Sequence, residues 1–355
     1  MVGVFAYLIG TATICLAQPG AESAYGLLWG GSLLQGLAWG SLEGVLNPLV
    51  VTIYPTRKVA RLNMFHGAYA LGMLLAAPIC ALVEKFALGW RLQLCIVFIP
   101  ALTALMLIAR LEYPPSERIV HGVSFGDMFR QTLRRPLFYL CLCAMFLTAA
   151  TELVPSNWID LTLTKVVGMQ GFWLVAFIYT VQLVVKMSTG FLNRHLRSAG
   201  ILMIGSIFAA AGLLLLSGAS DPIRGLFAAL LFGIGTAGMW PTTLAATSER
   251  FPEGGSFAIG TMASVGMLST YIMMPLFGKL FDAAKIKAAG GPVAFKSLLV
   301  RTPAYDRTMM DAATSIFQNG SVMPLVTIIF FGFLWLYDSR NRSAGVLLTK
   351  SALSD

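Results

Sequence analysis

The amino-acid sequence predicts an all-α membrane protein. Hydrophobic residues make up 57% of the 355 residues and charged residues only 12%, which is too little polar surface for a soluble protein of this length. The mean hydropathy is +0.76, and the apolar residues form runs long enough to cross about 30 Å of hydrocarbon. The net charge of +9 lies in short runs between these segments, a pattern that orients membrane helices and does not indicate a nucleic-acid partner.

The apolar runs predict about ten transmembrane helices in a lipid bilayer. They lie at residues 1–18, 25–54, 62–84, 91–111, 137–160, 169–192, 199–218, 224–248, 257–282 and 321–338. Lys and Arg concentrate in alternate connections, so the positive-inside rule places the 112–136 connection and the C-terminus in the cytoplasm. The connection at 283–320 is expected outside, although it is also basic. We therefore expect a multi-pass protein of the cell membrane, in bacteria the inner membrane.

Two hairpins of the sequence repeat each other. Tyr54-Pro55 ends the second segment and Phe251-Pro252 ends the eighth, and each pair is followed 23 residues later by another proline, Pro78 or Pro275. Because the hairpins are six segments apart in the same orientation, they predict the two parallel six-helix halves of a major facilitator, with two of twelve helices preceding Met1. The predicted divisions are 1–111 for helices 3–6 of the first half, 112–136 for a cytoplasmic linker, 137–338 for the second half and 339–355 for a cytoplasmic tail.

A carboxylate, Glu43, lies in the middle of the second apolar segment. Polar and aromatic side chains recur around it at every fourth residue and share one helix face: Gln35, Trp39, Glu43 and Asn47. A neighbouring stripe of Gly36, Gly40 and Gly44 would permit close approach of another helix. A charge at the bilayer centre costs about 2.5–3.5 kcal/mol, so Glu43 should face a water-filled cavity, a partner or a proton. The alternative is a protonated Glu43 that only hydrogen-bonds a neighbouring helix.

The same segment begins a longer motif. It reads Leu42-Glu43, Asn47-Pro48 and Val50, followed by Arg61-Leu62-Asn63. This motif resembles the LExxxNPxV and RLN pattern of the fucose–galactose–proton symporters of the major facilitator superfamily, and the resemblance covers residues 25–85 and 137–282. It implies proton-coupled transport of a sugar by alternating access, without a cofactor. It also implies that Glu43 is the proton-coupling residue and that Asn63 and His66 line the sugar cavity, where His66 departs from the usual amide.

Further candidate ligands lie on the third and fifth segments. Asn63 and His66 share a face with Tyr69, which suits recognition of hydroxyl groups, and a helix-packing network is the alternative. Pro155 should break the fifth segment, and broken helices are where transporters bind their substrates. The candidates beside this proline are Glu152, Asn157 and Trp158. The tryptophan either stacks on a sugar ring or only packs.

The sixth segment carries Gln182 and Lys186 on one face. Lys186 either reaches the inner interface or acts as a cavity cation that pairs with Glu43 or an anionic substrate. Below it, a stretch resembles the basic gating loop of the superfamily's second half, with Gly190, Arg194 and Arg197 as the gating residues. In the eighth segment, residues 233–238 match GxGxxG without a preceding strand, so we interpret these glycines as helix-packing residues and the following Trp240 as a cavity residue.

The remaining motifs argue against an enzyme. The five cysteines lie in apolar segments without disulfide-framework or zinc spacing, so we interpret them as packing residues, and no metal site is expected. No nucleophile triad, metalloprotease motif or phosphate-binding loop occurs in the sequence. We therefore expect a monomeric transporter of a small polar solute, a carbohydrate. Two alternatives stay open: a transporter relative that binds solute without moving it, and an intramembrane enzyme that acts on a lipid-linked substrate.

Overall fold

The computed structural model describes residues 1–116, 119, 122–156, 158, 171–300 and 302–351. The described residues form helices and the connections between them and include no strand. Eight helical stretches are long and apolar enough to cross a membrane, and the first helix is a shorter apolar one. The all-α membrane class is therefore confirmed, and each of the ten predicted segments coincides with a helix over most of its described length.

The N-terminal part of the chain forms five helices. They are α1 (Val2–Cys15), α2 (Ala24–Ile53), α3 (Lys58–Lys85), α4 (Trp90–Cys95) and α5 (Phe98–Ile108). The predicted span 91–111 is thus divided in two, and neither α4 nor α5 has a buried residue. Gly31 of α2 approaches Gly10 of α1 so closely that an added Cβ would lie 2.7 Å from its carbonyl oxygen, which explains why small residues occur there.

The second part of the chain is more deeply packed. Its helices are α7 (Phe125–Leu133), α8 (Pro136–Leu153), α10 (Gly171–Ser217), α11 (Pro222–Ala237), α12 (Met239–Arg250), α13 (Gly255–Ala288), α14 (Pro292–Ser297) and α15 (Pro303–Ser351), with a short 3-10 turn at Pro252–Gly254. α8 ends two residues before Pro155, as the proline predicts. At 1.5 Å per residue a straight α10 would measure about 70 Å, more than twice the hydrocarbon thickness. Its backbone instead turns at Arg197, where φ is 57° and ψ is 174°, and so contains two of the predicted spans.

Two predicted connections contain helix. The 283–320 connection contains the end of α13, all of α14 and the first 18 residues of α15, counted from Pro303 to Gly320. Ala and Lys favour helix after the apolar run of α13 stops, and Lys285 pairs with Asp282 at 2.6 Å one turn earlier. The expected gating loop is also helical at Gly190 and Arg194, and only Arg197 departs from helical geometry.

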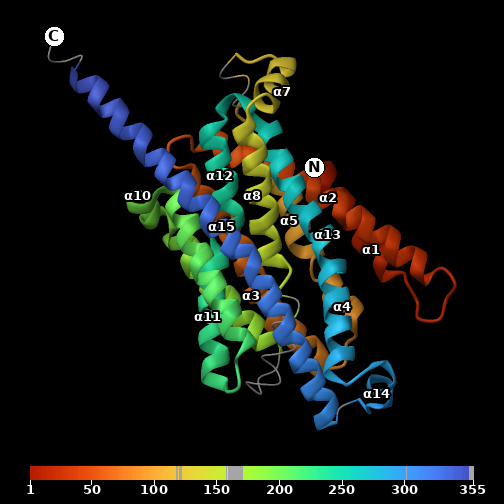
Figure 1. Cartoon of the computed structure of the whole chain (residues 1–355). Helices are drawn as coiled ribbons and strands as arrows, with labels where there is room; N and C mark the ends of the chain where they lie inside the picture. Colours follow the sequence, from red (N-terminus) through yellow and green to blue (C-terminus); the bar gives the residue numbers. More distant parts are fainter. Residues whose placement is uncertain (117–118, 120–121, 157, 159–170, 301, 352–355) are drawn as a thin grey trace.

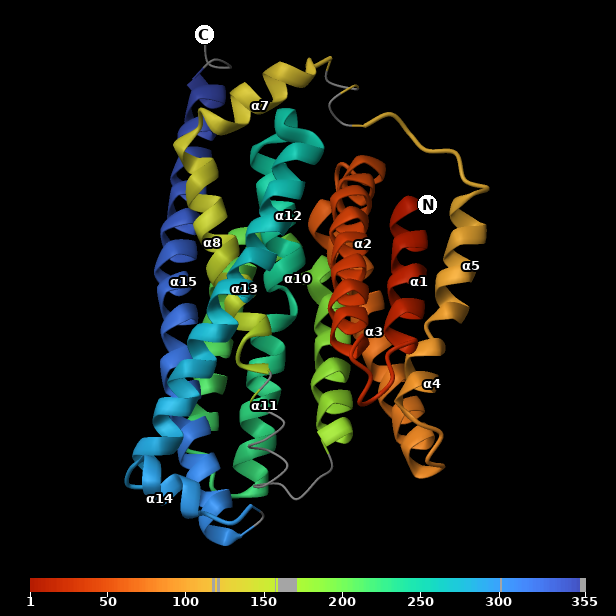
Figure 2. The same ribbon diagram turned by 90° about the vertical axis from the view of Figure 1, so that its right-hand side faces the viewer.

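The helices form two groups that face each other. Figure 2 shows α1 to α5 on one side and α8 with α11 to α15 on the other, while the linker containing α7 crosses the end at which the N-terminus also lies. The groups meet where α2 packs on α13 and where α3 packs on α10 and α12. Figure 1 shows the long α15 running diagonally across the second group. Residues from both groups therefore line the surface between them, where the candidate site lies.

Reporter fusions test the orientation of this bundle. A reporter placed after Arg135 or after Asp355 should give a cytoplasmic signal, and one placed after Ala21 should give an external signal, because the connections at the linker end hold most of the short-loop positive charge. Phosphatase and fluorescent-protein fusions report the two sides with opposite signals. The reverse pattern at these three positions would overturn the orientation.

Candidate functional site

The site is organised around a break between α11 and α12. Both helices belong to one membrane-spanning stretch, Pro222–Arg250, but the helix is interrupted at Gly238. Pro241 follows in the first turn of α12, and it lacks the N–H that would bond the carbonyl of Ala237 four residues earlier. The break exposes the carbonyl of Ala237, which accepts a hydrogen bond from Nζ of Lys186. Backbone freed in this way at membrane depth is tolerated where it lines a cavity or is buried in protein.

Small residues hold this break against α10. A Cβ added to Gly235 would lie 2.2 Å from the backbone nitrogen of Ala209, and one added to Gly205 would lie 2.8 Å from the carbonyl of Gly235. The backbones of α10 and α11 are therefore in direct contact. The interpretation of residues 233–238 as packing glycines is confirmed at Gly235.

Lys186 forms a buried ion pair with Glu152. Its side chain is 3% exposed, and Nζ lies 4.0 Å from Oε1 of Glu152 at the end of α8. The lysine therefore does not extend to the inner interface, and its carboxylate partner is Glu152 and not Glu43. The expected reach to the inner interface and the expected pairing with Glu43 are therefore wrong, because the carboxylate partner comes from a helix 34 residues away in sequence.

A second polar group joins α2 to α3. Asn47, one helical turn after Glu43, donates from Nδ2 to the Glu43 carboxylate and, at 3.1 Å, to the Glu43 carbonyl. Its Oδ1 lies 2.9 Å from Nε2 of His66. Since an amide oxygen only accepts, Nε2 of His66 carries the hydrogen when Asn47 faces Glu43 in this way. The three side chains form one hydrogen-bonded chain, and Lys186 lies within electrostatic reach of His66.

Glu43 also borders two hollows. One, of about 670 Å³, lies between the glycine stripe of α2 and Gly260, Ala263, Ser264 and Met267 of α13. The other, of about 320 Å³, lies between α2 and α3 and is lined by His66 and Tyr69. Gly36, Gly40 and Gly44 thus border open space, with no described atom within 4 Å of an added Cβ. The predicted close helix contact at the stripe is wrong, while the predicted cavity beside Glu43 is present.

Four buried polar atoms near the break have no hydrogen-bond partner among the described residues. They are Oδ1 of Asn63, Oε2 of Glu152, Oε1 of Gln182 and Nε1 of Trp240. The amide nitrogens of Asn63 and Gln182 are satisfied by Oγ1 of Thr242 at 2.9 Å and of Thr236 at 3.3 Å. The indole N–H of Trp240 lies near the Glu43 carboxyl group without forming a hydrogen bond to it. Unpaired buried groups cost about 1–3 kcal/mol each, so this set calls for an explanation.

Comparison with known proteins agrees with this architecture. The family model of the Major Facilitator Superfamily matches residues 1–274, which is more than half of the chain. The chain belongs to this superfamily. A search of curated proteins gave no match. Among solved structures, the E. coli fucose:proton symporter aligns with a TM-score of 0.63 and 16% identity, covering 93% of this chain and 82% of that one. A facilitator structure described as the same symporter in the outward conformation aligns with a TM-score of 0.68 and 17% identity, covering 93% and 81%. At 16% and 17% identity, these two alignments show only that the chain shares the fold of these structures.

Three aromatic side chains of this facilitator, one each from α2, α3 and α10, lie close together. Tyr69 is three residues after His66 on α3, and Tyr179 is seven residues before Lys186 on α10. Their ring centroids are 5.9 Å apart, and the ring of Trp39 lies 6.0 Å from that of Tyr69, both in edge-to-face geometry. Tyr69 was expected on one face with Asn63 and His66, and its approach to Tyr179 follows from the packing of α3 on α10.

Several predicted site residues have other positions in the facilitator fold. Gln35 donates to Oγ1 of Thr11 at 2.9 Å and so joins α2 to α1. The ring of Trp158 lies 6.3 Å from Phe277 and 6.1 Å from Phe281, against an apolar cluster of the second half. Gly190 packs on Ala60 of α3, whose Cβ would be 3.1 Å from an added Cβ. Asn157 lies outside the described residues.

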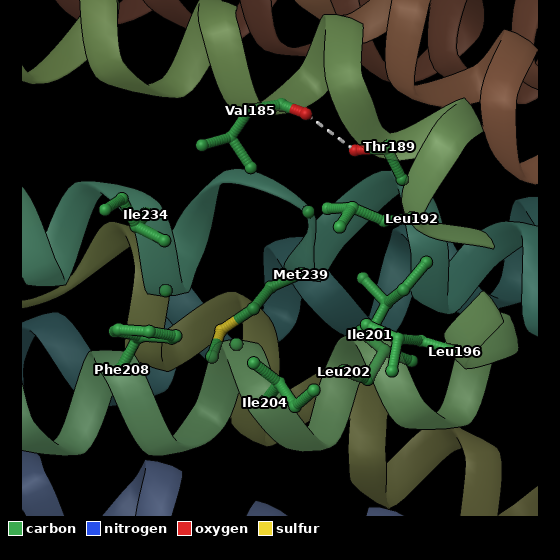
Figure 3. A pocket seen from close by; sticks show the side chains of 13 residues that line it. Val185, Thr189, Leu192, Leu196, Ile201, Leu202, Ile204, Phe208, Ile234 and Met239 are labelled. Carbon is green, nitrogen blue, oxygen red and sulfur yellow. Dashed lines mark hydrogen bonds between the residues drawn. The ribbon is translucent and has the colours of Figure 1, made fainter.

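The cavity in Figure 3 is not a candidate for a polar solute. It has a volume of about 210 Å³ and lies between Gly238 and the turn at Arg197. Figure 3 shows side chains such as Phe208, Ile234 and Met239 pointing into it. The hydroxyl of its Thr189 donates to the carbonyl of Val185 in its own helix. No polar side chain is therefore left to recognise hydroxyl groups in this cavity.

Proposed function

We propose that the protein transports a small polyhydroxylated solute, a sugar or related polyol, in symport with protons. The observation that carries the proposal is the set of unpaired polar atoms around the α11–α12 break. Three of the four are acceptors, on Asn63, Glu152 and Gln182, and one is the donor of Trp240. A hydroxyl group both donates and accepts, so a molecule with several hydroxyls can pair with both kinds of atom. A purely anionic or purely apolar solute cannot.

Alternating access requires a solute site between two groups of helices, and the proposed site takes residues from both groups. Asn63 and His66 belong to the first group of helices, whereas Glu152 and Trp240 belong to the second. Gln182 lies on α10, which packs on both α3 and α11. On the cytoplasmic side of the site, Nζ of Lys58 donates to Oγ of Ser248 at 3.0 Å and so joins α3 to α12. Release of the solute to the cytoplasm requires this contact and the Asn63–Thr242 hydrogen bond to open. Solute binding between the groups and rocking of one group against the other then form one cycle.

Proton coupling is assigned to Glu43 through its link to Asn47. An ionised Glu43 accepts from Nδ2 of Asn47, and Oδ1 of Asn47 then accepts from His66. A proton on the bonded oxygen of Glu43 removes that acceptor, so either the carboxyl group turns its other oxygen toward Asn47 or the amide and the imidazole reorient. Because His66 borders the hollow between α2 and α3, protonation of Glu43 changes the groups offered to the solute. This supplies a coupling free energy between proton and solute.

Binding measurements on two amide variants test the proposal. Asn63→Ala and Gln182→Ala should each weaken binding of the solute about 5- to 150-fold, since each removes a hydrogen bond worth about 1–3 kcal/mol. The solute is first found by measuring which monosaccharides and polyols raise the melting temperature of the purified protein.

The matched control is Gln35→Ala, which removes an amide bonded to Thr11 on α1. It should leave the dissociation constant unchanged. If no sugar or polyol stabilises the protein, or if all three variants bind equally well in calorimetry, the assignment of the site is wrong.

A further inference from the structure

We propose that Cys15 and Cys95 form a redox-sensitive disulfide at the outer face of the first helix group. Cys15 is the last residue of α1 and Cys95 the last residue of α4. Their Sγ atoms lie 3.8 Å apart although the residues are 80 positions apart in sequence. A disulfide requires about 2.0 Å between the sulfurs, and adjustment of the side-chain rotamers of two facing cysteines can supply that approach. The interpretation of these two cysteines as packing residues is therefore replaced.

The neighbours of the pair place it at the water interface. Arg91, one helical turn before Cys95, donates from Nε to the carbonyl of Cys15 at 2.9 Å and from a terminal nitrogen to the carbonyl of Ala17. A guanidinium is costly in the hydrocarbon core and therefore marks a level reached by water. The guanidinium carbon also lies 4.9 Å from the ring centre of Trp90, a residue type enriched at membrane interfaces.

The expected orientation puts this interface on the outer side, where thiols meet oxidising conditions. The connection after α1 and the connection before α4 both lie opposite the end crossed by the basic linker (Figure 2). Cys141 and Cys143 lie on α8, nearer the linker end. Outer and inner thiols of the same chain should therefore differ in their exposure to an external oxidant.

The reaction is thiol–disulfide exchange with an external low-molecular-weight disulfide. Cys95 is the more exposed of the two thiols, so its thiolate attacks the external disulfide, forms a mixed disulfide and releases one thiolate. The Cys15 thiolate then attacks Sγ of Cys95, forms the internal S–S bond and releases the second thiolate. The two protons lost by the cysteines go to the two released thiolates, and the two electrons reduce the external disulfide to two thiols.

The disulfide would fix α4 to α1 within the first helix group. α4 has no buried residue, and its described polar contacts to α1 run through Arg91 and the two sulfurs. A cross-link that closes a loop of about 80 residues restricts the unfolded chain strongly. The oxidised protein should therefore keep α1 and α4 together under conditions in which the reduced protein does not.

Peptide mapping after oxidation of oriented vesicles tests the proposal without measuring transport. Right-side-out vesicles are treated with membrane-impermeant oxidised glutathione, remaining thiols are blocked with N-ethylmaleimide, and the unfolded protein is digested. The expected result is a peptide pair joined through Cys15 and Cys95 that separates on reduction. It should be absent from Cys95→Ser and present at wild-type level in the matched control Cys143→Ser.

Three results would overturn the proposal. The first is N-ethylmaleimide on both Cys15 and Cys95 of the wild type after oxidation. The second is linkage of either cysteine to a second copy of the chain, recognised as a dimer on a non-reducing gel. The third is cross-linking in inside-out vesicles only, which would place the pair on the cytoplasmic side.

Discussion

Replacement of Glu43 by Gln should abolish accumulation of solute against a gradient while leaving counterflow exchange in vesicles. The glutamine keeps the shape of the side chain and an oxygen that can accept from Asn47, so the hydrogen-bonded chain to His66 is retained. It cannot titrate, so no proton is loaded on one side and released on the other. The measurements are uptake of radiolabelled solute driven by an imposed pH gradient and exchange of the same solute at equal concentrations.

The control is Glu84→Gln, an exposed carboxylate near the end of α3, which should accumulate solute as the wild type does. Wild-type accumulation in Glu43→Gln, with unchanged dependence on pH, would remove Glu43 as the coupling residue. Loss of both accumulation and counterflow would show that the side chain is needed for solute movement itself and would also contradict the prediction.

Replacement of Lys186 by Met should lower the free energy of unfolding by about 3–5 kcal/mol, because it leaves the carboxylate of Glu152 buried without its cation. The lysine also supplies the hydrogen bond to the carbonyl at the α11–α12 break. Chemical unfolding of the protein in detergent measures the loss. Lys287→Met, on an exposed lysine in the last turn of α13, is the matched control and should change the free energy by less than about 0.5 kcal/mol.

The double variant Lys186→Met with Glu152→Gln separates ion pairing from packing. Because it removes both charges, its loss of stability should be clearly smaller than the sum of the two single losses, with a coupling of about 1–3 kcal/mol. Additive losses would mean that the 4.0 Å approach of Nζ and Oε1 contributes nothing.

Local spacing predicted part of the site. Glu43 and Asn47 are four residues apart, so one helical turn was sufficient to bring the carboxylate and the amide together. Likewise Asn63 and His66 were expected on one face of α3, and both meet partners there. Pro155 predicted the end of α8, because proline disfavours continuation of a helix.

Contacts between distant helices were not predictable in the same way. Gln35 belongs to the same periodic face as Glu43, yet it bonds Thr11 because α1 covers that end of α2. Trp158 has the ring expected to stack on a sugar but packs on Phe277 and Phe281 of α13. The distribution of apolar residues along a single helix does not say which neighbour covers which end.

The sequence by itself determined that the chain is a bundle of apolar membrane helices with a carboxylate at the centre of one of them. This was possible because hydropathy, helical periodicity and the positions of proline are local properties that a bilayer selects directly. Only the tertiary structure decided that Lys186 pairs with Glu152, that four polar atoms around Gly238 are left unpaired and that Cys15 faces Cys95. Each of these depends on which helices pack side by side and at what rotation, because a shift of one residue turns a helix by about 100° and brings a different side chain to the interface.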